Sequence, residues 1–182
     1  MPVSPISLSD LAATSAVVTS NGKEYHVTQS YTLTKDLIIE YDEILFIDVV
    51  VEFTINSDVY VYNGGLVFLI GDGIQTKISN HGIFVNKGMV SSSNINEYFY
   101  TKSDGYFYNL NPNQVGGGDY GDSSALYNFT GETGSKVFDV KTGSTPNLAR
   151  NNDIQPDEYT SNYQGGIPVT KVQIQQQQQQ QL

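Results

Sequence analysis

The feature that most constrains the fold is an alternation of side chains that runs from Leu37 to Val61. Eleven of the thirteen odd-numbered positions in this stretch are apolar or aromatic, whereas most of its acidic residues stand at even positions. A period of two is that of a β-strand, whose successive side chains point to opposite faces. The stretch is also rich in β-branched and aromatic residues, which favour strands. The sequence therefore predicts an all-β protein.

The alternation is too long for one strand, because 25 residues at about 3.3 Å each exceed ordinary strand lengths. Apolar doublets start six to eight residues apart, at Leu37/Ile39, Leu45/Ile47, Phe53/Ile55, Val59/Val61 and Val67/Leu69. Short strands that turn the same face inward at each corner are typical of a β-solenoid. The alternative is an antiparallel sandwich or jelly roll, although residues 37–62 contain no Asn-Gly or Asp-Gly hairpin signal.

The pattern Asn-x-Gly recurs after the alternating stretch, at positions that predict sharp corners. The corner residues are Asn63, Gly65, Asn80, Gly82, Asn86 and Gly88. Asn tolerates the left-handed backbone region and Gly occupies it freely, so the pair suits a repeated turn. Asn side chains at such corners could also stack into a ladder from one coil to the next.

Taken together, the doublets and the Asn-x-Gly repeats resemble short right-handed β-helix segments of surface and virion proteins. The resemblance covers roughly residues 32–94 and includes structural proteins of large DNA viruses, such as minor capsid proteins. It implies a right-handed parallel β-helix of two to four turns. The chain departs from the pattern at Asp42 and Glu43, where glycine is common at corners.

Composition divides the chain into four expected segments. They are an N-terminal arm at 1–30, a solenoid core at 31–95, Tyr- and Gly-rich loops with short strands at 96–141, and an extended strap with a poly-Gln tail at 142–182. Short strands are expected at Glu97–Thr101, Tyr106–Leu110 and Ser135–Lys141. The tail, Gln175 to Gln181, cannot build a core and is expected to be disordered unless it pairs with a neighbouring chain.

The charge balance argues against nucleic acid as a partner. The chain has 19 Asp and Glu against 9 Lys and Arg, for a net charge of −10, whereas phosphate binding needs clustered basic residues.

Residues 1–22 lack the basic start and apolar run of a signal peptide. No stretch reaches the roughly 20 apolar residues of a membrane span, so we expect neither a cleaved signal nor membrane insertion.

The motifs of common active sites are incomplete. Gly131 to Lys136 lacks the Gly-Lys-Ser/Thr order of a phosphate-binding loop. His26 and His81 could act as a general base, but the sequence has no Gly-x-Ser-x-Gly motif to supply the serine nucleophile. The absence of Cys removes thiolate zinc sites and cysteine nucleophiles, and no calcium-loop spacing is present. We therefore expect no enzyme activity, no cofactor and no metal.

Tyrosines repeat at every second residue in the second half of the chain. The candidate contact residues are Tyr98, Tyr100, Tyr106, Tyr108, Tyr120 and Tyr127. Such rings are either half-buried on a covered face or part of an interface, where Tyr is enriched.

These observations favour a structural subunit of an assembly that cements neighbouring subunits. The partners would be protein neighbours, with a homo-oligomer as one option. The resemblance adds the context of a virion assembled in the host cytoplasm, with the chain as a minor capsid component. The alternative is a carbohydrate-binding or adhesive surface module.

Overall fold

The chain forms a short parallel β-helix, as the alternation predicts. A computed structural model describes residues 5–48, 51–71, 76–93, 97–111, 115–116, 125–126, 129–132, 134–139, 163–164 and 167–168. Strands of consecutive coils pair in parallel wherever both are described. This parallel pairing replaces the antiparallel sandwich that the sequence left open.

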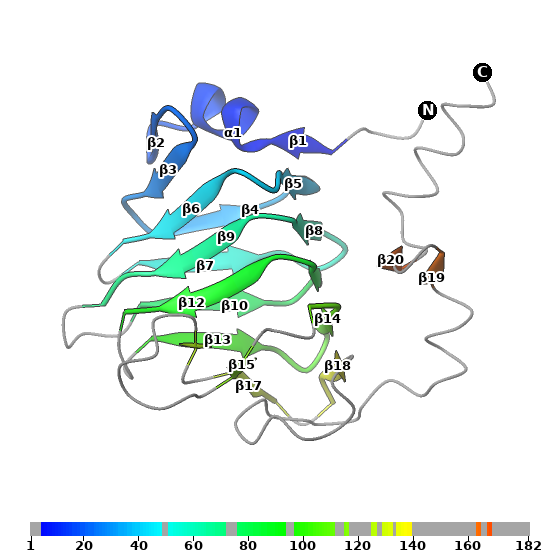
Figure 1. Ribbon diagram of the computed structural model, residues 1–182. Coiled ribbons are helices and arrows are strands. Elements are labelled where there is room, and N and C mark those ends of the chain that lie inside the picture. The colour runs from blue at the N-terminus through cyan, green and yellow to red at the C-terminus, as the bar shows by residue number, and fades with distance from the viewer. Residues whose placement is uncertain are drawn as a thin grey trace.

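Three sheets form the sides of the helix (Figure 1). Sheet A holds β1 (Ile6–Ser7), β5 (Leu37–Ile39), β8 (Tyr60–Asn63), β11 (Ile83–Asn86), β14 (Tyr106–Asn109) and β18 (Lys136–Asp139). Sheet B holds β2 (Val18–Asn21), β3 (Glu24–Val27), β6 (Ile44–Ile47), β9 (Leu66–Leu69) and β12 (Met89–Ser92). Sheet C holds β4 (Tyr31–Leu33), β7 (Glu52–Ile55), β10 (Lys77–Asn80), β13 (Tyr98–Thr101) and β17 (Phe129–Gly131).

Each coil adds one strand to sheet C, then one to sheet A, then one to sheet B. Three coils are complete in the described residues, namely β4–β6, β7–β9 and β10–β12, and β13 and β14 begin a fourth. In Figure 1 the strands of sheet C run left to right behind those of sheet B, which return right to left as the chain descends. The coil is therefore right-handed, within the predicted range of two to four turns.

Four further short strands pair outside the three sheets. They are β15 (Val115–Gly116) with β16 (Ala125–Leu126), and β19 (Tyr163–Gln164) with β20 (Ile167–Pro168). Within the described residues, no helix is long and apolar enough to cross a membrane.

The core lies inside the coil and consists of the alternating residues that the sequence assigned to the inner face. Leu37, Ile39, Leu45 and Ile47 are each at most 2% exposed. Further down, Phe84, Phe99 and Phe107 from three strands pack ring against ring. Burial of this face stabilises the fold by about 25 cal/mol per Å² of apolar surface.

Residues 5–30, expected to form an extended arm with a possible short helix around Asp10–Val18, pack on the first coil. The helix α1 (Leu8–Thr14) lies over the upper end of the coil in Figure 1 and buries Leu8 and Leu11. A reciprocal pair of hydrogen bonds between Ser7 and Asp10 caps its first turn. β1 extends sheet A and β3 extends sheet B. The N-terminal segment is therefore part of the solenoid and covers the upper end of its core.

Two of the predicted corner asparagines, Asn63 and Asn86, form the expected ladder together with Asn109, whereas Asn80 donates to the Tyr106 carbonyl instead. Asn63 Nδ2 donates to Asn86 Oδ1 at 3.0 Å, and Asn86 Nδ2 donates to Asn109 Oδ1 at 3.1 Å. Successive members are 23 residues apart, which is one coil at this corner. All three are at most 1% exposed, and mutual pairing satisfies amide groups that would be costly to bury alone.

The corner glycines serve a different purpose from the one expected. Gly65, Gly82 and Gly88 are not among the described residues with positive φ. A Cβ at Gly82 would instead lie 2.2 Å from the carbonyl oxygen of Val59, and one at Gly88 would lie 2.0 Å from that of Gly65. Glycine is required here because the backbones of stacked coils approach closely.

Candidate functional site

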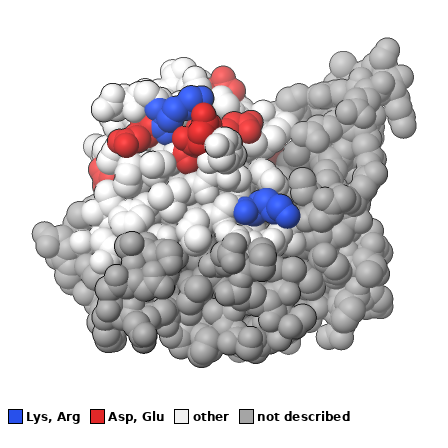
Figure 2. Space-filling view, in the orientation of Figure 1, with Lys and Arg blue, Asp and Glu red and all other residues white. Residues whose placement is uncertain are grey.

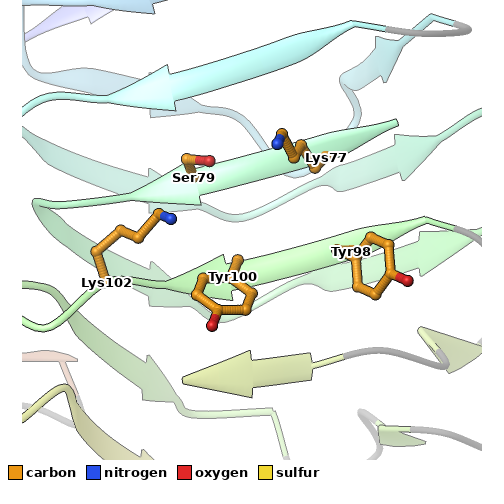
Figure 3. Close-up of a pocket in the computed structure, with 5 residues that line it drawn as sticks. All are labelled: Lys77, Ser79, Tyr98, Tyr100 and Lys102. Carbon is orange, nitrogen blue, oxygen red and sulfur yellow. The ribbon is translucent and has the colours of Figure 1, made fainter. Parts of the chain in front are cut away.

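A shallow hollow lies on the outer face of sheet C, between β10 and β13. Its lining residues are Lys77, Ser79, Tyr98, Tyr100 and Lys102, and its volume is about 200 Å³. We call it the Tyr–Lys hollow. Figure 3 shows Lys77 and Ser79 on one strand and the two tyrosine rings on the next. The parallel register places Lys77 opposite Tyr98 and Ser79 opposite Tyr100, so alternate residues of both strands share this face.

Each lysine of the Tyr–Lys hollow is held by a carboxylate on a neighbouring coil. Lys77 Nζ lies 3.0 Å from Glu52 Oε2, and Lys102 Nζ lies 3.3 Å from Glu132 Oε1. The hydrogen bond from Lys77 is the main reason why the pKa of Glu52 lies below its usual value. The Lys102 ammonium also lies 4.6 Å from the centroid of the Tyr100 ring, within the range of a cation–π contact.

A second hollow, of about 170 Å³, lies at the corner where sheet C passes into sheet A. Its lining residues are Ser57, Asp58, His81, Gly82, Ile83, Asp104 and Tyr106, and we call it the His–Asp hollow. His81 Nδ1 lies 2.9 Å from Asp104 Oδ1, and Ser57 Oγ donates to Asp104 Oδ2 at 3.0 Å. Although burial acts to raise the pKa of Asp104, the hydrogen bonds from Ser57 and His81 hold it below its usual value.

The His–Asp hollow contains a serine, a histidine and an aspartate, but not in catalytic order. A serine nucleophile must donate to the histidine that removes its proton. Here both Ser57 and His81 bind the aspartate. In the described part of the chain, no group of three or more His, Cys, Asp or Glu residues could hold a metal ion. The arrangement offers hydrogen-bond donors and acceptors to a ligand.

The structure separates the predicted contact tyrosines into different environments. Tyr98 and Tyr100 are partly exposed and line the Tyr–Lys hollow, and Tyr106 lines the His–Asp hollow. Tyr108 is only 6% exposed and packs in a second apolar cluster on the outer side of sheet A, with Tyr60, Val85 and Leu110. Tyr120 and Tyr127 lie outside the described residues.

The outer face of sheet B is largely apolar between Glu24 on β3 and Ser91 on β12. Two columns of outward side chains follow the parallel register, and we call them the sheet B ladders: Ile44, Leu66 and Met89 in one, and His26, Phe46 and Phe68 in the other. All six are partly exposed. The His26 ring stacks on Phe46 with centroids 4.5 Å apart, and Phe46 meets Phe68 edge to face at 5.9 Å.

Sequence reasoning missed the residues that complete the Tyr–Lys hollow. Lys77, Ser79 and Lys102 were not selected, because nothing in their own neighbourhood marks them as a site. Only the register between coils brings them beside the candidate tyrosines. Lys77 and Tyr98 are partners in the register, so a residue about one coil before each candidate tyrosine lies beside it.

Comparison of the chain with protein-family models, with curated proteins and with solved structures finds no match, so the site stands on its own geometry.

Proposed function

We propose that this chain is a non-enzymatic structural subunit of a larger assembly, in which it cements neighbouring protein subunits. The virion context comes from the resemblance of the repeats to short β-helix segments, and the proposal includes it as a minor capsid role. The observation that carries the proposal is the apolar outer face of sheet B.

The sheet B ladders have the character of a contact surface. Figure 2 views the molecule from the side of sheet B. Most charged side chains gather near the top of this view, and the described surface below them is uncharged except for one basic side chain at its right. Contiguous apolar surface with a polar border is typical of protein interaction sites. One ladder contains Met89 and the other contains Phe46 and Phe68, and both Met and aromatic residues are enriched in the cores of interfaces.

Charge indicates what kind of neighbour would suit this face. Glu24 and Asp42 stand beside the ladders and are exposed. Asp42 pairs with Lys23 at 3.7 Å, and Asp48 holds His26 at 2.9 Å. The chain as a whole carries −10, so two copies would repel each other. A neighbour with an apolar centre and a basic border is therefore favoured over a second copy.

The test is whether the chain belongs to a particle and uses this face there. Particles from the cells that produce the chain would be separated on a density gradient, and we expect the wild-type chain to sediment with them at a fixed copy number. The double variant Phe46→Thr/Phe68→Thr should remain folded by circular dichroism but stay in the soluble fraction.

Thr54→Ser, on the outer face of sheet C, is the matched control and should sediment like the wild type. The assembly role would be wrong if the wild-type chain remained a soluble monomer and was absent from every particle fraction. Sedimentation of the double variant at the wild-type copy number would instead exclude the sheet B face as the contact.

A further inference from the structure

We propose that the outer face of sheet C binds a neutral oligosaccharide, with the Tyr–Lys hollow as one subsite and the His–Asp hollow as the next. This inference is independent of the assembly role, because it uses a different face and different residues.

The two hollows follow one another along the same pair of coils. Lys77 and Ser79 precede His81 on one coil, and Tyr98, Tyr100 and Lys102 precede Asp104 on the next. A site that follows two parallel coils in this way suits an extended chain. Each hollow is smaller than the roughly 300–1,000 Å³ of enclosed small-molecule sites. A ligand would therefore lie on the surface with one side facing water.

The tyrosines supply flat apolar surface. Tyr98 and Tyr100 project from the same face of β13, about 7 Å apart along the strand. Sugar rings present C–H groups on their faces, and aromatic rings offer apolar contact with a polar hydroxyl at the edge. Lys102 lies over Tyr100, which holds part of this surface in place.

The charges favour a neutral ligand over an anion. Lys77 and Lys102 are each paired with a carboxylate, Glu52 and Glu132 respectively, so the lining carries little net positive charge. An anion would have to displace a carboxylate from its lysine. A hydroxyl group can instead accept from an ammonium and donate to the neighbouring carboxylate, and it needs no such exchange.

The second hollow offers the same kind of polar contacts. Asp104 already accepts from Ser57 and His81, and a carboxylate has further acceptor capacity for ligand hydroxyls. Tyr106 adds a third ring on the outer side of the next strand, β14. The hollow has no lysine among its lining residues, which again disfavours an anionic group.

The experiment is a binding screen of the full chain on an array that carries neutral oligosaccharides and their sialylated and sulfated counterparts. We expect binding to a subset of the neutral glycans. Binding of the best neutral glycan would then be measured by calorimetry, and the affinity should be nearly the same at low and high salt, because no ionic contact with the ligand is formed.

The variants locate the site. Tyr100→Ala should weaken binding about tenfold, as expected for the loss of one aromatic contact, while Tyr100→Phe should keep most of the affinity. Tyr41→Ala is the matched control, since Tyr41 is 86% exposed at a corner that is not part of either hollow. Tyr41→Ala should bind like the wild type.

Three results would overturn the proposal. The first is no binding to any neutral glycan at millimolar concentrations. The second is binding only to acidic glycans, with an affinity that falls steeply with salt. The third is an equal loss of binding in Tyr41→Ala and Tyr100→Ala. None of these results bears on sedimentation with particles, so failure here and failure of the assembly role can be told apart.

Discussion

At the scale of single residues, the buried asparagine ladder is the most demanding feature of the fold. Asn86 occupies its middle, accepting from Asn63 and donating to Asn109. Asn86→Ala removes one hydrogen bond from each neighbour, while Asn63 Nδ2 still donates to the Met89 carbonyl and Asn109 Oδ1 still accepts from the Asn111 amide. The expected cost is therefore about 1 kcal/mol for each hydrogen bond lost. We expect a clear fall in the urea midpoint. Asn56→Ala, at an exposed corner, is the control and should leave the free energy of unfolding within about 0.5 kcal/mol of wild type. Equal urea midpoints for the two variants would contradict a structural role for the ladder.

Two glycines distinguish close approach from backbone conformation. Gly22 has φ of +64° with open space around it, whereas Gly82 is limited by the carbonyl oxygen of Val59. Ala should destabilise the protein at both positions, by about 1–2 kcal/mol at Gly22. Asn, which tolerates the left-handed region, should restore stability at Gly22 but be worse than Ala at Gly82. Thermal unfolding of the four variants checks this, and rescue by Asn at Gly82 would show that conformation matters there after all.

At the scale of elements, α1 covers the first coil. Leu11 is 1% exposed, and Leu11→Ala should cost about 2–5 kcal/mol. Ala13→Ser, on the exposed side of the same helix, should cost far less. Because an uncovered coil end exposes apolar core and strand edges, Leu11→Ala should also form concentration-dependent oligomers, measured by light scattering after size exclusion. A variant that unfolded more easily yet stayed monomeric would show that α1 stabilises the coil without protecting it from association.

The elements also show how far the sequence predicts this fold. Between Leu37 and Val61 the inner positions are nearly all apolar and most of the acidic residues stand at outer positions, so the period and the inward face could be predicted. In β13 the outward Tyr98 and Tyr100 flank the inward Phe99, and the contrast disappears because both faces are aromatic. The strand itself was expected, but not its place in the solenoid.

The ends of the solenoid and the site depend on spacing that the sequence alone leaves open. The Asn21-Gly22 turn between β2 and β3 is a hairpin signal that lies outside the alternating stretch. The Tyr–Lys hollow depends on the register between coils. That register pairs Glu52 with Lys77 but Lys77 with Tyr98, so the coil length varies and no fixed period would have aligned the site.

At the scale of the whole molecule, ion pairs between coils connect stability to pH. Lys77 depresses the pKa of Glu52 below its usual value of 4.5. A carboxylate with a depressed pKa in the folded state contributes stability that is fully present above its unfolded pKa and is lost as pH falls through the folded one. The acid side of the stability profile, below about pH 4.5, should therefore include a contribution from the pair between β7 and β10.

Glu52→Gln removes that contribution and should make the melting temperature less dependent on pH in this window. At neutral pH the cost should stay below about 1 kcal/mol, because both side chains are more than two-fifths exposed, at 43% and 42%. Glu24→Gln is the control, since Glu24 is exposed and forms no ion pair within the described residues. Thermal melts from neutral to acid pH compare the three proteins. If the melting temperatures of Glu52→Gln and the wild type fell by the same amount with pH, the Glu52–Lys77 pair would not contribute to the pH dependence of stability.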